Sequence, residues 1–275
     1  MKLKKLAAAL AAIMMLTLVT ACSANEGNAA GSAAKTISVS GSTSVGPLVE
    51  KLAEANKGEN DKIEVNQIGS SAGITNAIKG VSEIGMSSRD LKEEEKAEGL
   101  KETIIAHDGI AVVVHTANKV GNLTMEQVKE IYTGKITNWS ELGGDDAEIV
   151  VVSREDGSGS RDAFQEIIGF ESAELSKDAV VANGNGNIKT TVNNNEQAIG
   201  YVSFEYLDAS VSPVMIDGVE ATQENVLEGA YSLSRPFIMV YKEGSISKEG
   251  KQFIDYILSE DGQKIVSGSG AIPVQ

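Results

Sequence analysis

One short segment carries side chains suited to binding an anion. Residues 153–161, SREDGSGSR, lie between the apolar run 149–152 and the amphipathic segment 162–168, an order that predicts a strand, a loop and a helix. The first backbone N–H groups of a helix have no intrahelical partner and lie at the positive end of its dipole. Serine hydroxyls and forked guanidinium groups are further donors for a tetrahedral oxyanion. The donors that this segment offers are the hydroxyls of Ser158 and Ser160 and the guanidinium groups of Arg154 and Arg161, with Asp156 placed to hold Arg154 in one orientation. Its glycines let the main chain approach a ligand closely.

The same order of strand, Ser/Gly turn and helix occurs three more times. The turns are GSTS at 41–44, GSSAG at 69–73 and MSSR at 86–89. One such turn is weak evidence, but four in one chain predict helix N-termini that converge on a single anion. The side chains that these three turns offer are those of Ser42, Thr43, Ser44, Ser70, Ser71, Ser88 and Arg89.

The hydrophobic pattern predicts an α/β fold with a mostly parallel sheet, because short β-branched runs alternate with helical segments. We expect strands at 36–40, 62–68, 83–86, 101–107, 109–115, 149–152, 198–203, 211–216 and 237–241, and helices at 47–56, 74–79, 91–98, 124–132, 162–168, 247–258 and 261–266. Ser234-Arg235-Pro236 interrupts the pattern. A short polar helix is expected within 183–195, with its start near the anion site.

The N-terminus has the features of a bacterial lipoprotein signal. Residues 1–21 combine early lysines with an apolar run too short for a comfortable membrane span. Cleavage is expected before Cys22, because residues 19–22, VTAC, resemble a lipobox; the alternative is an ordinary secretory signal with an incidental cysteine. Residues 22–35 are rich in Ala, Ser, Gly and Asn and predict a flexible tether. The protein is therefore expected at the extracytoplasmic face of the cell membrane, held by its lipid alone.

The composition excludes several partners. The formal net charge is −15, which disfavours nucleic acid and anionic lipid surfaces, so local donors must bind any anion. The single cysteine excludes an intrachain disulfide. No cluster of side chains has metal-ligand spacing, so neither a metal nor another cofactor is expected.

The main alternative is a secreted serine hydrolase. Residues 69–73 satisfy G-x-S-x-G, with Ser71 as the nucleophile, in a predicted strand-turn-helix context. The hydrolase order requires a late histidine, whereas the two histidines here are His107 and His115, so we expect no enzyme. A Ser-Lys arrangement with Lys79 stays open, as does a secreted signalling or adhesion protein that binds an anion.

Taken together, these motifs resemble the PstS family of phosphate-binding proteins, which feed the bacterial phosphate ABC importer. The resemblance rests on the four Ser/Gly turns and on residues 131–134, IYTG, with Asn138-Trp139, and it spans nearly the whole mature chain. It implies a two-lobed periplasmic-binding-protein-like fold (type II), with mixed sheets flanked by helices and two hinge strands. Lobe 1 would comprise 36–113 and 238–275, and lobe 2 would comprise 114–237. The resemblance also implies the function: the protein would be a monomer that closes around inorganic phosphate and delivers it to the permease subunits of an ABC importer.

By this resemblance, phosphate would contact Thr43, Ser44, Ser70, Ser88, Arg154, Ser158, Gly159 and Ser160. In the best-known branch of the family, the position of Ser88 is an aspartate that accepts the phosphate proton and repels sulfate. A hydroxyl accepts the proton without that repulsion, so selectivity must rest elsewhere or be weaker. Arg89 and Arg161 are expected to add charge-assisted bonds to the ligand. The alternative for Arg89 is a surface ion pair with Asp90 or Glu93.

Overall fold

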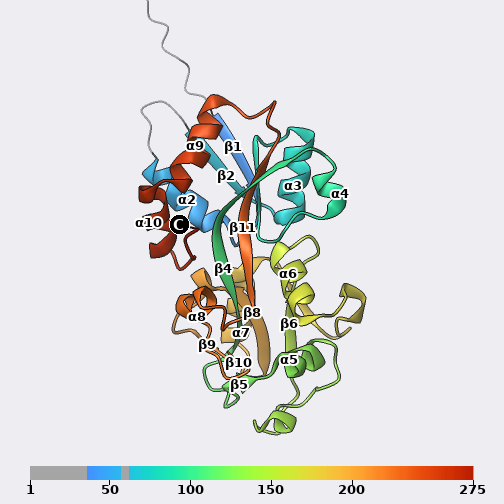
Figure 1. Cartoon of the computed structure of the whole chain (residues 1–275). Coiled ribbons are helices and arrows are strands. Elements are labelled where there is room, and N and C mark those ends of the chain that lie inside the picture. The colour runs from blue at the N-terminus through green and yellow to red at the C-terminus, as the bar shows by residue number, and fades with distance from the viewer. Residues whose placement is uncertain (1–35, 57–61, 275) are drawn as a thin grey trace, which may run out of the picture. The chain divides into compact units, whose positions relative to one another are not determined.

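The first three strands lie parallel, with β1 in the middle (Figure 1). The computed structural model describes residues 36–56 and 62–274, so the predicted signal peptide, Cys22 and the tether lie outside the described residues. The strands are β1 (Thr36–Gly41), β2 (Lys62–Gln67) and β3 (Ile84–Ser87). Because their carboxyl ends meet at one edge, the Ser/Gly turns that follow them are brought together.

Helices cover both faces of these strands. On one face α2 (Gly46–Ala55), α9 (Lys248–Leu258) and α10 (Glu260–Gly268) share a buried cluster with β1. Phe253 and Ile257 of α9 belong to this cluster together with Ile37 and Val39, so the C-terminal helices complete the core that the first strand begins. On the other face α3 (Ser70–Lys79) packs Ile74 and Ala77 against Ile238 and Val240.

Two long strands run side by side through the sheet. They are β4 (Lys101–His115) and β11 (Ser234–Tyr241), which pair antiparallel with Ser234 opposite Gly109. The prediction of two strands at 101–107 and 109–115 is wrong, because Asp108 continues the strand. The prediction of a break at 234–236 is also wrong: Pro236 lies opposite His107, inside β11.

Beyond residue 109, β4 leaves β11 and pairs with other strands. Its second half pairs with β8 (Ala198–Ser203) and β9 (Val211–Pro213), and β8 pairs with β6 (Val150–Arg154). The order of the mixed sheet in the described residues is β2-β1-β3-β11-β4-β8-β6-β7, with β9 beside β4. One end of this order is β7 (Val180–Ala182), and the other is β2.

The part of the sheet that contains β8 and β6 is also covered by helices on both faces. Tyr201 of β8 stacks on Phe164 of α6 (Gly159–Ile168), with ring centroids 4.1 Å apart, and contacts Tyr132 of α5 (Met125–Tyr132). Gly200 faces α7 (Gly184–Asn193), where a Cβ would lie 2.7 Å from Ile188. Successive residues of a strand face opposite sides, so β8 joins both layers of helices.

The remaining elements are short. They are α4 (Glu93–Lys96), β5 (Asn122–Leu123), η1 (Trp139–Leu142), η2 (Ser172–Glu174), η3 (Phe204–Tyr206), β10 (Met215–Ile216) and α8 (Gln223–Leu227). The strand predicted at 211–216 is therefore two pieces, because Val214 separates β9 from β10, which pairs with β5. The polar helix expected within 183–195 is α7. The predicted α/β class, with mixed sheets flanked by helices, is confirmed.

The buried core changes along both long strands. In β4, Ala106 belongs to the cluster beneath α2 and α9, whereas Ile110 belongs to the cluster around Tyr201. In the other long strand Phe237 belongs to the first cluster, and Leu233, just before that strand, belongs to the second. The lobe boundaries predicted at 113/114 and 237/238 stay a prediction. None of the helices described here has the length and apolar character needed to cross a membrane.

Candidate functional site

The turns after β1, β2 and β3 meet through their serine hydroxyls. Ser42 Oγ donates to Ser88 Oγ at 2.9 Å, and the Ser88 backbone N–H donates to Ser70 Oγ at 3.2 Å. All three side chains are buried. The predicted convergence of these turns is therefore observed.

The turn after β6 joins the same cluster. Ser160 Oγ lies 2.8 Å from Ser44 Oγ, and the Ser71 backbone N–H donates to the Gly157 carbonyl at 3.1 Å. Gly159 approaches so closely that a Cβ there would lie 2.2 Å from Ser70 Oγ. The segments that meet here are more than 80 positions apart in sequence, so the fold brings all four predicted turns to one place.

Helix starts supply backbone donors at this meeting point. Ser70 opens α3, and Gly159 and Ser160 open α6, where the Ser158 side chain accepts from the Arg161 N–H. Gly69, the residue just before α3, has φ +93°, a conformation that favours glycine. The helix predicted from residue 74 begins instead at Ser70, so the Ser/Gly turn forms its first turn. The first N–H groups of these helices have no intrahelical acceptor and suit an anion.

Arg154 is buried at the end of β6, with its side chain 1% exposed. Its Nε and Nη2 each donate to Glu155 at 2.8 Å, and Nη2 also donates to Thr43 Oγ1 at 3.0 Å. Among the described residues, Nη1 has no hydrogen-bond partner. A buried donor left unpaired costs about 1–3 kcal/mol, so Nη1 marks a position for an acceptor.

The prediction that Asp156 orients Arg154 is wrong. Asp156 accepts from Arg161 Nη1 at 2.6 Å, while Glu155 takes both forked bonds of Arg154. Burial raises the pKa of Glu155, but the hydrogen bonds and charge of Arg154 outweigh burial and leave that pKa below its ordinary value. Glu155 is therefore the carboxylate that fixes Arg154.

The carboxylates that pair with Arg89 differ from those predicted from the sequence. Its guanidinium donates to Glu95 at 2.7 and 2.8 Å, and Nε lies 2.9 Å from Asp162 at the start of α6. Neither carboxylate suggested from the sequence pairs with it, since the contact with Asp90 is to the backbone carbonyl. Direct contact of Arg89 with a ligand stays a prediction, and these acceptors argue against it because they occupy most of the fork.

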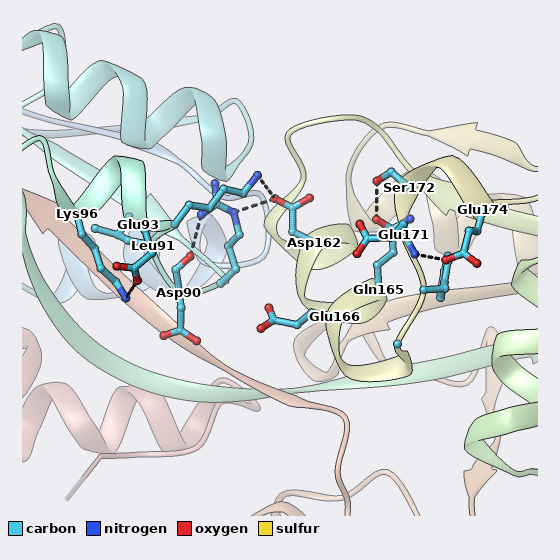
Figure 2. Close-up of a pocket in the computed structure, with 14 residues that line it drawn as sticks. Asp90, Leu91, Glu93, Lys96, Asp162, Gln165, Glu166, Glu171, Ser172 and Glu174 are labelled. Carbon is cyan, nitrogen blue, oxygen red and sulfur yellow. Dashed lines mark hydrogen bonds and ion pairs between the residues drawn. The ribbon is translucent and has the colours of Figure 1, made fainter.

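Arg89 and Asp162 both line a pocket of about 770 Å³ (Figure 2). Asp90 and Glu93 lie at one end and Glu171 and Glu174 at the other, with Asp162 between them. The pocket is rich in carboxylates, which repel anions. This pocket is therefore less suited to an anion than the cluster formed by Ser42, Ser44, Ser70, Ser88 and Ser160.

The sequence predicts no role at the site for four residues that lie beside these serines: Asn185, Ser203, Asp108 and Arg235. Asn185, at the start of α7, donates from Nδ2 to Ser44 Oγ at 2.9 Å and accepts from the Ser203 N–H at 3.1 Å. Arg235 Nη2 donates to the same hydroxyl at 3.1 Å and to Asp108 at 3.0 Å. The start of α7 is thus beside the serine cluster, as expected, although its asparagine was not singled out.

The environment of Ser71 does not favour a nucleophile. Its Oγ accepts from Arg89 Nη2 at 3.2 Å, and a guanidinium stays protonated and cannot act as a general base. Among the residues described, no group of His, Cys, Asp and Glu side chains could hold a metal ion.

Comparisons with known proteins agree on one family. Residues 26–261 match the model of the PBP superfamily domain. A phosphate-binding protein PstS from Bacillus subtilis is 36% identical over 250 residues, covering 88% of this chain and 82% of that protein. A PstS from Borreliella burgdorferi is 30% identical, covering 88% of this chain and 91% of that protein.

Solved structures give the same result. A putative phosphate ABC transporter substrate-binding protein from Clostridium perfringens, solved with bound phosphate, is 62% identical with a TM-score of 0.86, and the match covers 87% of this chain and all of that one. An ABC-type phosphate transport receptor from Vibrio cholerae is 38% identical with a TM-score of 0.74, covering 86% and 99%. The predicted periplasmic-binding-protein-like fold is therefore confirmed, and the chain belongs to the PstS family of phosphate-binding proteins within the PBP superfamily.

Proposed function

We propose that this protein captures inorganic phosphate between two lobes and delivers it to an ABC importer. The observation that carries the proposal is Arg154 Nη1, a buried donor without an acceptor among the described residues. Nη2 of the same guanidinium donates to Thr43 Oγ1, and the next residue, Ser44, forms the hydroxyl pair with Ser160. A phosphate oxygen provides the missing acceptor. The B. subtilis and C. perfringens relatives support this choice of anion, since the latter was solved with phosphate bound.

The ligand contacts that we propose come from all four turns. Guanidinium and oxyanion form charge-assisted hydrogen bonds, and serine hydroxyls can donate to phosphate oxygens or accept the proton of monohydrogen phosphate. The proposed set is Thr43, Ser44, Ser70, Ser88, Arg154, Ser158, Gly159 and Ser160, with Ser42, Ser71 and Arg161 supporting them. Two lobes, 36–113 with 238–275 and 114–237, would then close around the anion.

Ser88 makes the selectivity for phosphate over sulfate weaker in this proposal. Ser88 Oγ already accepts from Ser42 Oγ, so it can turn its own hydrogen toward a ligand oxygen. A hydroxyl does not repel sulfate as a carboxylate does, so we expect phosphate to be preferred over sulfate by a smaller factor than with an aspartate at this position.

Calorimetric titration of the full chain, expressed in bacteria and extracted in detergent, tests this function. Inorganic phosphate should bind at one site per chain without being turned over, and sulfate should compete measurably. A Ser88→Asp variant should lose sulfate competition before it loses phosphate binding. Wild-type protein that binds neither anion would contradict the proposal.

The proposed location depends on Cys22. If this cysteine carries the lipid, wild-type protein will be recovered with the membrane fraction, and a Cys22→Ala variant will not. Permease subunits of an importer are the proposed partners, with the phosphate-loaded monomer as the delivered form. Co-purification with those subunits, dependent on phosphate, would test delivery.

A further inference from the structure

Asp108 and Arg235 form a buried ion pair between the two long strands. They lie opposite each other in the register of β4 and β11, with Arg235 Nη2 3.0 Å from Asp108 Oδ2. Both side chains are at most 1% exposed. A buried ion pair is weak evidence for stability, because desolvation offsets the attraction between the charges, so a functional role is worth seeking.

The carboxylate holds Arg235 in a fixed orientation. Asp108 Oδ1 accepts from Ser203 Oγ at 2.8 Å, and Oδ2 accepts from both Nε and Nη2 of Arg235 at 3.3 and 3.0 Å. Nη2 also donates to Ser44 Oγ at 3.1 Å. In the described part of the chain, the remaining nitrogen, Nη1, has no partner although it is buried.

Within the described residues, Arg154 also has a buried Nη1 without a partner and also contacts the turn after β1. Arg154 donates to Thr43 Oγ1, next to the Ser44 hydroxyl that Arg235 contacts, and its own Nη1 is buried without a partner among the described residues. Burial lowers the pKa of Arg235; Asp108 opposes this shift, and the charge of Arg154 adds to it. Two buried guanidinium groups that repel each other and have one free nitrogen each are suited to a shared anion.

We propose that Arg235 is a second anion-binding arginine, which donates from Nη1 to the same phosphate as Arg154, and that Asp108 is its positioning residue. This inference rests on the proposed function and deepens it. The ligand would be held by a guanidinium from β6 and by another from a long strand shared by both halves of the sheet. Phosphate recognition would then require the crossover strands as well as the serine turns.

The decisive variant removes both charges of the pair. In Asp108→Asn/Arg235→Gln the buried side chains stay polar and similar in size, but neither leaves an unpaired charge. If Arg235 binds the anion, calorimetry on the full chain will show phosphate affinity about 10- to 100-fold weaker, while the thermal midpoint without phosphate stays within about 4 °C of wild type. A matched control, Glu260→Gln/Lys264→Gln, removes an exposed ion pair of α10 and should bind phosphate as wild type does.

Wild-type affinity in the folded double variant would overturn the inference, since Arg235 would then serve only as the counter-ion of Asp108. If the double variant does not fold, Arg235→Lys replaces it: this variant keeps the charge but loses the fork. The rise in thermal midpoint caused by phosphate should be smaller in Arg235→Lys than in wild type, and an equal rise would also overturn the inference. Failure of wild type itself to bind phosphate would instead contradict the proposed function.

Discussion

Glu155 folds back onto its neighbour Arg154, and its two carboxylate oxygens accept from Nε and Nη2 at 2.8 Å each. The same carboxylate accepts from the Gly184 N–H at 3.1 Å, at the first residue of α7. One glutamate therefore links the end of β6 to the start of α7 and leaves only Nη1 of the fork without an acceptor among the described residues. Glu155 therefore sets the orientation in which the Arg154 guanidinium faces a ligand.

Replacing Arg154 with Ala should abolish measurable phosphate binding at micromolar protein, because it removes the forked donor and leaves Glu155 without its cation. Glu155→Gln should weaken phosphate binding about tenfold, since the fork loses its charged anchor. Asp156→Asn is the matched control: its side chain is 95% exposed and pairs with Arg161, so affinity should change less than about threefold. Calorimetric titration of the three variants checks this order, and a larger effect from Asp156 than from Glu155 would contradict it.

Local sequence signals predicted much of this site. Serine and glycine after a strand and before a helix indicate a turn with unpaired N–H groups, and all four such turns meet in the structure. Charge partners were harder to predict, because Glu155, Asp156 and Arg161 all lie within a few residues of Arg154. Which carboxylate faces which arginine depends on the direction of each side chain where β6 ends, and spacing alone does not determine that direction.

The Asp108–Arg235 pair shows why the rest could not be found. Each residue interrupts an apolar run, which predicts a break between strands, whereas both lie inside strands and opposite each other. The two residues lie on neighbouring strands and are 127 positions apart in sequence. Without the strand register, nothing near either residue identifies the other.

Gly159→Ala should impair binding by steric clash. A Cβ at this position would meet Ser70 Oγ at 2.2 Å and Ser88 Oγ at 2.8 Å, so the turn after β6 could not approach the serine hydroxyls. We expect phosphate affinity to fall by at least about tenfold in calorimetry. Gly268→Ala is the control, because that glycine of α10 has open space around its Cα and alanine favours a helix. Equal affinities in the two variants would show that the turns do not have to meet to bind phosphate.

Asp162→Asn should shorten the lifetime of bound phosphate. Asp162, labelled in Figure 2, lies at the start of α6 and pairs with Arg89. Glu95 binds the other side of the Arg89 guanidinium, so the Asp162–Arg89 contact joins the turn after β3 to the helix after β6. The pair is partly exposed, so the expected change is modest, about two- to fivefold in the dissociation rate measured by stopped flow. Asp261→Asn, in the exposed first turn of α10, should leave the rate unchanged. An unaltered rate in Asp162→Asn would mean that the contact does not help to hold the ligand in place.

Glu95→Gln should reduce stability at neutral pH and lose this effect in acid. Burial raises the pKa of Glu95, but hydrogen bonds from Arg89 and from the Lys92 backbone outweigh it, so the folded pKa lies below the ordinary value of 4.5. A lowered folded pKa adds stability above the unfolded pKa, and that stability is lost as the pH falls through the folded pKa. Urea midpoints at a series of pH values should therefore differ most between wild type and Glu95→Gln near pH 7, and they should converge as the pH falls through the lowered folded pKa of Glu95. The neighbouring variant Glu94→Gln, on the exposed side of α4, controls for the loss of one negative charge. A difference that stays constant from neutral to acid pH would show that the Glu95 carboxylate does not titrate with folding, and that Arg89 gains nothing from its charge.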